Sequence, residues 1–192
     1  MPESVQEAVR THLDHGRACL DKGKYDDAIA CFDEAIALDP NFATAYTNRG
    51  VAYRKKGEYD RAIADYDKAI ALNPNIATAY ANRGLAYRKK GEVDRAIADY
   101  DKAIALDPNG ALAYHNRGFA YDHKGDHDRA IADYDKAIAL DPEDAAAYFN
   151  RGLAHESKGE VDRAIADFSK VLEIDPSDQD AKDGLKRLSV TP

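Results

Sequence analysis

The sequence predicts an all-α fold, a right-handed α-solenoid (superhelix) of antiparallel helix pairs. Prolines recur every 34 residues, at positions 40, 74, 108, 142 and 176, and the sequence between them repeats with them. Each period contains two stretches whose apolar residues recur at the spacing of an α-helix, with a glycine between the stretches. One helix pair cannot bury its apolar face alone, so the pairs must stack, and stacking gives a curved solenoid.

The 34-residue period divides the chain into five repeats and a tail. No linker or low-complexity segment interrupts them, so we predict one domain, a single array over residues 1–192. The repeats span residues 7–40, 41–74, 75–108, 109–142 and 143–176, and a C-terminal capping helix follows at about 177–189. The second and third repeats differ at only five positions, which also fits an engineered or recently duplicated array without a dedicated ligand.

The elements of a repeat follow from its residues, as the second repeat illustrates. The first helix is predicted from residues that share one face, namely Ala45, Tyr46, Gly50 and Tyr53. Gly57 comes next, where a glycine can take the left-handed conformation that ends a helix. The second helix is predicted from a second shared face, namely Ala62, Ile63, Tyr66, Ala69 and Ile70. Pro74 then ends the repeat, because proline cannot continue a helix.

These residues fall at the spacing of the tetratricopeptide repeat (TPR), and the chain resembles that family over nearly its whole length. The matching positions of the second repeat, which recur in the third and fourth, are Tyr46, Gly50, Tyr53, Ala62, Tyr66, Ala69 and Pro74. The first repeat departs at His12 and Cys19, and the fifth at His155 and Val171. The tail resembles a capping helix with Ala181, Leu185 and Leu188 on one face. The resemblance implies a binding module whose ligand surface is a concave groove lined by the first helices.

Charge and composition limit the partners. The net charge is −8 and the isoelectric point about 5.2, so the molecule as a whole repels nucleic acid and anionic membranes. The start, MPESVQEAVR, lacks the apolar core of a secretory signal, and no run approaches the ~18 apolar residues of a membrane span. We therefore expect a cytoplasmic protein without nucleic-acid or membrane partners. Cys19 and Cys31 lack metal-ligand spacing and are interpreted as buried free thiols.

One departure from the TPR pattern recurs in four repeats. The place before the glycine, usually leucine in this family, holds an arginine, and a buried arginine needs a partner. An aspartate stands sixteen residues further on, in the facing helix. We predict the structural ion pairs Arg49 with Asp65, Arg83 with Asp99, Arg117 with Asp133, and Arg151 with Asp167. The alternative is that these arginines reach toward a ligand.

No pattern predicts an enzyme. The DYD triplets that begin at Asp65, Asp99 and Asp133 resemble the metal-binding DxD of sugar-nucleotide transferases, but they lie within a helix, which favours a solvated or ion-paired face. His123 and His127 have the spacing of zinc ligands on a helix, yet Gly125 marks a turn between them. HExxH, GxGxxG and GxxxxGK motifs are absent. We predict no catalysis, no metal and no cofactor.

Three rows of residues are predicted to line the concave groove. An asparagine recurs two places before the glycine, and a ladder of amides can hydrogen-bond the main chain of an extended peptide, as in the asparagine ladder of the O-linked N-acetylglucosamine transferase superhelix. The alternative is that these asparagines only cap or solvate their helices. An apolar row and a basic group would take ligand side chains. The predicted peptide-binding residues are Asn48, Asn82, Asn116, Asn150, Val51, Leu85, Phe119, Leu153, Arg54, Lys55, Arg88 and Lys89.

We therefore expect an adaptor or scaffold that binds an extended peptide or a partner helix in the groove, with an acidic segment of the ligand over repeats two and three. Self-assembly, in which the array receives a second copy of the chain, is an alternative. Nucleic-acid binding through the basic group would show a steep loss of affinity with salt, and the net charge opposes it. The clamp that holds chaperone tails in some TPR proteins is not predicted, because Leu13, Arg17, Thr78 and Asn82 stand where its basic residues should lie.

Overall fold

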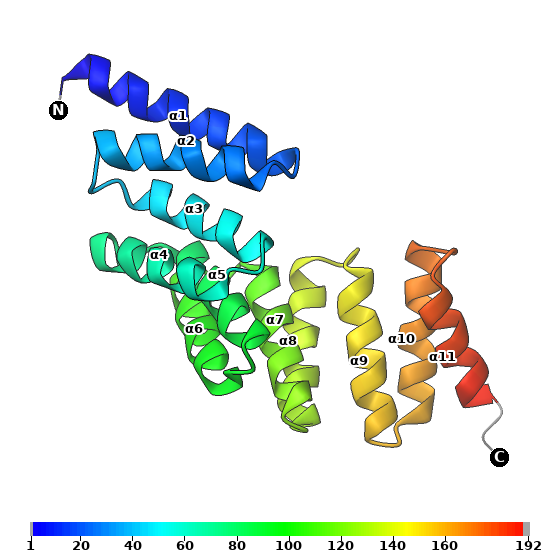
Figure 1. Cartoon of the computed structure of the whole chain (residues 1–192). Helices are drawn as coiled ribbons and strands as arrows, with labels where there is room; N and C mark the ends of the chain where they lie inside the picture. Colours follow the sequence, from blue (N-terminus) through cyan, green and yellow to red (C-terminus); the bar gives the residue numbers. More distant parts are fainter. Residues whose placement is uncertain (1, 190–192) are drawn as a thin grey trace. The chain divides into compact units, whose positions relative to one another are not determined.

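The computed structural model describes residues 2–189, and in this part of the chain every regular element is an α-helix (Figure 1). The helices are α1 (Glu3–Asp21), α2 (Tyr25–Leu38), α3 (Ala43–Lys55), α4 (Tyr59–Leu72), α5 (Ala77–Lys89), α6 (Val93–Leu106), α7 (Ala111–His123), α8 (His127–Leu140), α9 (Ala145–Ser157), α10 (Val161–Ile174) and α11 (Gln179–Ser189). The predicted all-α helical repeat fold is confirmed. None of these helices combines the length and the apolar character needed to cross a membrane.

The chain divides into two compact units. Unit 1, residues 1–106, contains the three helix pairs α1 to α6, and unit 2, residues 107–192, contains the pairs α7 to α10 and the helix α11. The division falls at the end of the third repeat. The single array over residues 1–192 stays a prediction, and its residue 1 and residues 190–192 lie outside the described residues.

A glycine turn joins the two helices of every repeat. Gly57 has a φ of +82°, in the left-handed region that glycine reaches without steric cost. The amide of Glu58 then donates to the carbonyl of Tyr53 at 2.9 Å, a bond that closes the end of a helix. The glycines at the equivalent places, Gly23, Gly91, Gly125 and Gly159, also have positive φ. The predicted turns are therefore confirmed.

Close contact between a glycine and an aromatic ring holds each helix pair together. A Cβ at Gly50 would lie 2.7 Å from Cε1 of Tyr66, whose side chain is fully buried. The same contact occurs at Gly16 with Phe32, Gly84 with Tyr100, Gly118 with Tyr134, and Gly152 with Phe168. In α11, Gly184 lies against the other edge of Phe168, while Ala181 and Leu188 are buried. The tail therefore caps the core of the last repeat.

The two cysteines are free, and they are only partly buried. Both are partly exposed, and Cys19 lies at the edge of the core around Phe32. Burial and the neighbouring Cys19 thiol raise the pKa of the Cys31 thiol. The prediction of buried thiols is wrong because the first repeat has no arginine over these places. In the second repeat Arg49 covers the equivalent positions, with its guanidinium carbon 5.9 Å from the centre of the Tyr53 ring.

Candidate functional site

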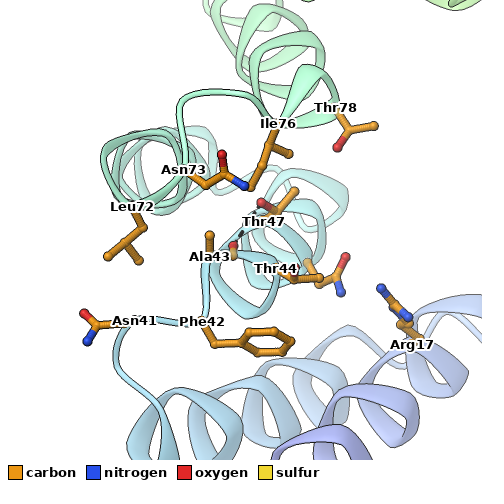
Figure 2. Close-up of a pocket in the computed structure, with 11 residues that line it drawn as sticks. Arg17, Asn41, Phe42, Ala43, Thr44, Thr47, Leu72, Asn73, Ile76 and Thr78 are labelled. Carbon is orange, nitrogen blue, oxygen red and sulfur yellow. Dashed lines mark hydrogen bonds between the residues drawn. The ribbon is translucent and has the colours of Figure 1, made fainter. Parts of the chain in front are cut away.

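The first helices of unit 1 form a pocket. Helix α1 contacts α3, and α3 contacts α5. The pocket has a volume of about 430 Å³ and is drawn in Figure 2. Its lining residues are Arg17, Asn41, Phe42, Ala43, Thr44, Thr47, Asn48, Leu72, Asn73, Ile76 and Thr78. We call it the Arg17 pocket.

The residues just before α3 and α5 set two walls of the Arg17 pocket. Phe42 packs partly buried against the core of the first repeat, and Ile76 packs in the same way against a cluster that contains Ala43. Figure 2 shows Phe42 and Ile76 on either side of the start of α3, with Thr44 and Thr47 between them. Because both wall residues rest on buried side chains, the pocket is part of the packed fold.

The lining of the Arg17 pocket contains one cation and no carboxylate, although the chain carries a net charge of −8. The Arg17 side chain is 51% exposed, and its Nη1 lies 3.9 Å from Oδ1 of Asp14, which is also exposed. An exposed pair of this kind contributes at most about 1 kcal/mol. The other polar liners are asparagines and threonines, which can donate hydrogen bonds. The pocket therefore has the chemistry to accept an anionic or amide group.

The four predicted asparagines do not form a uniform ladder. In Asn82 and Asn116 the amide Nδ2 donates to the carbonyl four residues earlier, that of Thr78 at 2.9 Å and that of Leu112 at 2.8 Å. These bonds fit the alternative in which the asparagines serve their own helices. Asn48 differs, because its Nδ2 is buried and makes no hydrogen bond, while its side chain lines the Arg17 pocket.

In unit 2 the last asparagine bonds to a histidine. Nδ2 of Asn150 lies 3.2 Å from Nε2 of His115, and Nδ1 of the same ring lies 3.0 Å from Oδ2 of Asp144. The other carboxylate oxygen of Asp144 accepts the amide of Ala147 and caps α9. His115 therefore connects α7 to the start of α9 and occupies the amide of Asn150.

The predicted apolar row lies partly in the cores. Val51 packs against the cluster around Tyr66, and Leu153 packs against the cluster around Phe168. Leu85 and Phe119 are also partly buried, and the Phe119 ring lies 5.7 Å from the ring of His123. The residue at this place in the first repeat is Arg17, which lines the pocket instead.

The predicted basic group divides into two kinds of residue. Lys55 and Lys89 are exposed, whereas Arg54 and Arg88 are partly buried. Arg54 lies beside the hydroxyl of buried Tyr66, where it opposes the effect of burial, which raises the pKa of that hydroxyl. Burial likewise raises the pKa of Tyr100 to about 12, and Arg88 again opposes it. The two arginines thus contribute to packing, and of these four residues only the two lysines are exposed to solvent.

The structure brings each predicted arginine and aspartate together. In Arg83, Nε lies 2.8 Å from Oδ2 of Asp99 and Nη2 lies 2.7 Å from Oδ1, a two-point contact to a buried carboxylate. The pairs Arg49 with Asp65, Arg117 with Asp133, and Arg151 with Asp167 have the same geometry. The hydrogen bonds to Asp99 raise the pKa of Arg83 further above its already high usual value. The guanidinium therefore stays charged.

The arginines also cross-link neighbouring repeats. Nη1 of Arg49 contacts Asp33, Nη1 of Arg83 contacts Asp67, and Nη1 of Arg151 contacts Asp135, each at 2.5 Å. The first aspartate of the DYD triplet at residue 65 thus meets the arginine of its own repeat, and the second meets the arginine of the next. The two carboxylates face different guanidinium groups, as an ion-paired helix face requires.

The histidines at the turn of the fourth repeat do not face each other. Nδ1 of His127 lies 2.7 Å from Oδ1 of Asp122, while His123 is exposed and contacts Phe119. Within residues 2–189, no group of three or more His, Cys, Asp or Glu side chains is placed to hold a metal ion.

Sequence reasoning missed most of the Arg17 pocket. Thr44 and Thr78 stand four residues before Asn48 and Asn82, on the same helix face, and this spacing was a signal that could have found them. Arg17 could have been found by extending the row of Val51 into the first repeat. Phe42 and Asn73 carry no such signal, because they belong to loops that only the packing of the repeats brings to the pocket.

Comparison with known proteins places this architecture in a family. The sequence profile described as tetratricopeptide repeat matches residues 13–75 and 116–179. A profile described as TPR repeat matches residues 84–122, and a further tetratricopeptide repeat profile matches residues 65–98. The first profile alone covers more than half of the chain.

Solved structures agree with these matches. A crystal structure of MamA protein is 34% identical, over 89% of this chain and 93% of that chain, with a TM-score of 0.75. MamA 41-end from Desulfovibrio magneticus RS-1 is 26% identical, over 90% of this chain and 97% of that chain, with a TM-score of 0.78. YrrB, described as a TPR protein with an unusual peptide-binding site, is 22% identical, over 96% of this chain and 98% of that chain, with a TM-score of 0.75, and shares the fold. The repeated residues, the helix pairs and these matches together establish that the chain belongs to the tetratricopeptide repeat family.

Proposed function

We propose that this chain is a non-catalytic interaction module, an adaptor that binds an extended peptide segment across the first helices of unit 1. The observation that carries the proposal is the Arg17 pocket, which collects a cation, amides and hydroxyls and contains no carboxylate. Proteins of the TPR family generally act as interaction modules for protein partners. The same fold in YrrB carries a peptide-binding site.

The geometry of the pocket favours an extended segment over a partner helix. Its lining comes from three successive repeats, with Arg17 on α1, Thr44 on α3 and Thr78 on α5. An extended segment laid across these helices presents alternate side chains to one face, about 7 Å apart, while its main chain can bond to side-chain amides. The side chain of Asn48 is also part of the pocket lining, beside the path of such a segment.

The ion pairs of the fold support the non-catalytic part of the proposal. The carboxylates that arginines hold at two points, such as Asp99 beside Arg83, are buried. Groups fixed in this way stabilise the helix pairs and are not free to exchange protons with a substrate.

A random peptide library displayed on phage and selected against the immobilised chain tests the proposal. Selected peptides are expected to bind the parent in solution and to bind a Thr44→Trp variant at least about tenfold more weakly, since the indole would fill the Arg17 pocket. Ala146→Trp is the matched control, because Ala146 is an exposed residue at the place of Thr44 in the last repeat of unit 2. Circular dichroism must show that the three proteins are equally helical.

The possible outcomes separate the alternatives. Failure to select any peptide would overturn the proposal. Equal binding to both tryptophan variants would place the ligand away from the Arg17 pocket and would overturn the proposed site. Selected sequences with apolar residues at a helical spacing of three and four would show that the ligand is a partner helix.

A further inference from the structure

A second pocket adjoins the Arg17 pocket. It has a volume of about 260 Å³ and is lined by Gln6, Val9, Arg10, Leu13, Asp39 and Phe42. Phe42 lines both pockets and therefore forms the wall between them. We call the second one the Val9 pocket. Both lie within unit 1, along the same side of α1.

The two pockets differ in chemistry. The floor of the Val9 pocket is the core of the first repeat, because Val9 and Leu13 are buried members of that core and Phe42 packs against it. The carboxylate of Asp39 at its edge already accepts the amide of Asn41 in the loop. The Val9 pocket has this apolar floor, and its lining holds both a guanidinium, that of Arg10, and the carboxylate of Asp39, so it suits an apolar side chain. The Arg17 pocket has one guanidinium and no carboxylate, so it suits an anionic side chain.

The distance between the pockets matches an extended peptide. Leu13 lines one pocket and Arg17 lines the other, and the two residues are one helical turn apart on α1, about 6 Å along its axis. Side chains two residues apart in an extended strand lie on the same face, about 7 Å apart. Phe42, between the pockets, would lie under the residue that separates them.

We infer that unit 1 recognises an extended segment in which an apolar side chain and a carboxylate side chain stand two residues apart. The apolar side chain enters the Val9 pocket, and the carboxylate pairs with Arg17. This inference rests on the proposed function and names the ligand class of the same site. It places the acidic part of the ligand over the first and second repeats, beside Arg17, and not over Arg54 and Arg88.

The charge of the Arg17 pocket favours a single carboxylate over the two carboxylates of an acidic C-terminal residue. A C-terminal residue with an acidic side chain brings two carboxylates, and the Arg17 pocket has one cation to balance them. In a chain of net charge −8, a second uncompensated carboxylate would be repelled. One arginine therefore matches one carboxylate.

The test uses short synthetic peptides with both ends blocked, titrated into the full chain and followed by NMR or by fluorescence anisotropy. The reference peptide carries leucine, serine and glutamate in that order between glycine and serine residues. Replacing the glutamate by glutamine, or the leucine by serine, is expected to weaken binding by about tenfold each. Separating leucine and glutamate by three residues is expected to weaken it to the same degree.

Two variants assign each preference to its pocket. Arg17→Gln is expected to abolish the preference for glutamate over glutamine while the preference for leucine over serine remains. Gln6→Trp fills the Val9 pocket from an exposed position and leaves the core intact. It is expected to abolish the preference for leucine over serine while the preference for glutamate over glutamine remains. Lys22→Glu is the matched charge control, because Lys22 is exposed and lines neither pocket. It is expected to weaken binding by less than about twofold.

Several results would overturn the inference. Equal binding of the glutamate and glutamine peptides would do so, and so would binding that requires a free C-terminus. A loss of both preferences in each variant would show that the pockets do not read separate side chains. If the phage library selects peptides that lack the apolar and acidic pair, this inference fails while the proposed function stands. If the library selects nothing, both fail.

Discussion

The two units hold their helix pairs together in the same way but show different surfaces on their first helices. The contact of Arg83 with Asp99 in unit 1 and that of Arg151 with Asp167 in unit 2 have nearly identical distances. On the first helices, by contrast, Thr78 of unit 1 corresponds to Leu112 of unit 2, whose side chain is 65% exposed. The repeat therefore fixes the scaffold and leaves the first-helix face free to change.

The asparagines show the same difference at the level of single hydrogen bonds. Asn48 in unit 1 keeps a buried Nδ2 without a partner, next to the Arg17 pocket. Asn150 in unit 2 uses its Nδ2 on His115, which also bonds to Asp144. The same repeated residue is thus hydrogen-bonded to a neighbouring repeat at Asn150 and left without a partner for its Nδ2 at Asn48. The following predictions test this comparison, from the largest expected effect to the smallest.

Removal of the buried arginine should destabilise both units strongly and equally. Arg83→Ala would leave the carboxylate of Asp99 buried without its partner, and Arg151→Ala would do the same to Asp167. Each change is expected to lower the free energy of unfolding by about 3–5 kcal/mol, measured by urea denaturation. Arg163→Ala, which removes a side chain that is 70% exposed, should change it by less than about 0.5 kcal/mol. A loss of under about 1 kcal/mol at either buried arginine would contradict the shared scaffold.

Addition of one methyl group at the glycine–ring contact should also destabilise both units. A Cβ at Gly84 would lie 2.7 Å from Cε1 of Tyr100, and one at Gly152 would lie 2.8 Å from Cε1 of Phe168. Gly84→Ala and Gly152→Ala are each expected to cost about 1–3 kcal/mol in thermal or urea unfolding, because the rings are fully buried and cannot move aside freely.

A double variant gives the control for this contact. In the background of Tyr100→Leu, Gly84→Ala should cost less than it does in the parent, since the atom that the methyl group meets is gone. Equal costs in the two backgrounds would show that the clash with the ring is not the cause.

Substitution of the asparagines should affect the stability of the two units differently. Asn150→Ala removes a hydrogen bond to His115 and is expected to lower the free energy of unfolding by about 1 kcal/mol. Asn48→Ala removes an amide without a partner and should change stability by less than about 0.5 kcal/mol. Chemical denaturation of the two variants in parallel measures the difference. A larger loss for Asn48→Ala than for Asn150→Ala would mean that Asn48 serves the fold.

The smallest expected effect concerns acid stability. Lys158 and, to a lesser degree, His155 lower the pKa of Glu160 to about 2. A carboxylate with a lowered pKa contributes its stability above its unfolded pKa of about 4.3 and loses it as the pH falls toward about 2. The difference in melting temperature between the parent and Glu160→Gln should therefore be constant above about pH 5 and vanish near pH 2.

The matching carboxylate of unit 1 sharpens this measurement. Arg95 and Lys90 lower the pKa of Glu92. The difference in melting temperature between the parent and Glu92→Gln should therefore also shrink as the pH falls. Glu34→Gln, at an exposed glutamate in unit 1, is the control. If the difference in melting temperature between the parent and Glu160→Gln grows as the pH falls, the lowered pKa of Glu160 is contradicted.

Local pattern was enough to predict the scaffold. The places of Gly57 and Pro74 predicted where helices end, since glycine takes the left-handed turn and proline lacks the amide that a helix needs. The constant separation of sixteen residues predicted that Arg83 and Asp99 face each other across a helix pair, and they do. These features depend on residues within one repeat, so a single period of sequence contains them.

Only the tertiary structure decided the ligand surface. The Arg17 pocket joins residues from α1, α3, α4, α5 and two loops, and no spacing within a repeat places Phe42 beside Arg17. The hydrogen-bond partner of each asparagine also depends on its neighbours. Asn150 bonds to His115 of the preceding repeat, whereas Asn82 bonds to its own helix. The sequence by itself determined the helix pairs and their ion pairs, which are local. The packing of successive repeats decided which polar groups were left unpaired beside a pocket, because burial and hydrogen bonding there depend on side chains that are distant in sequence.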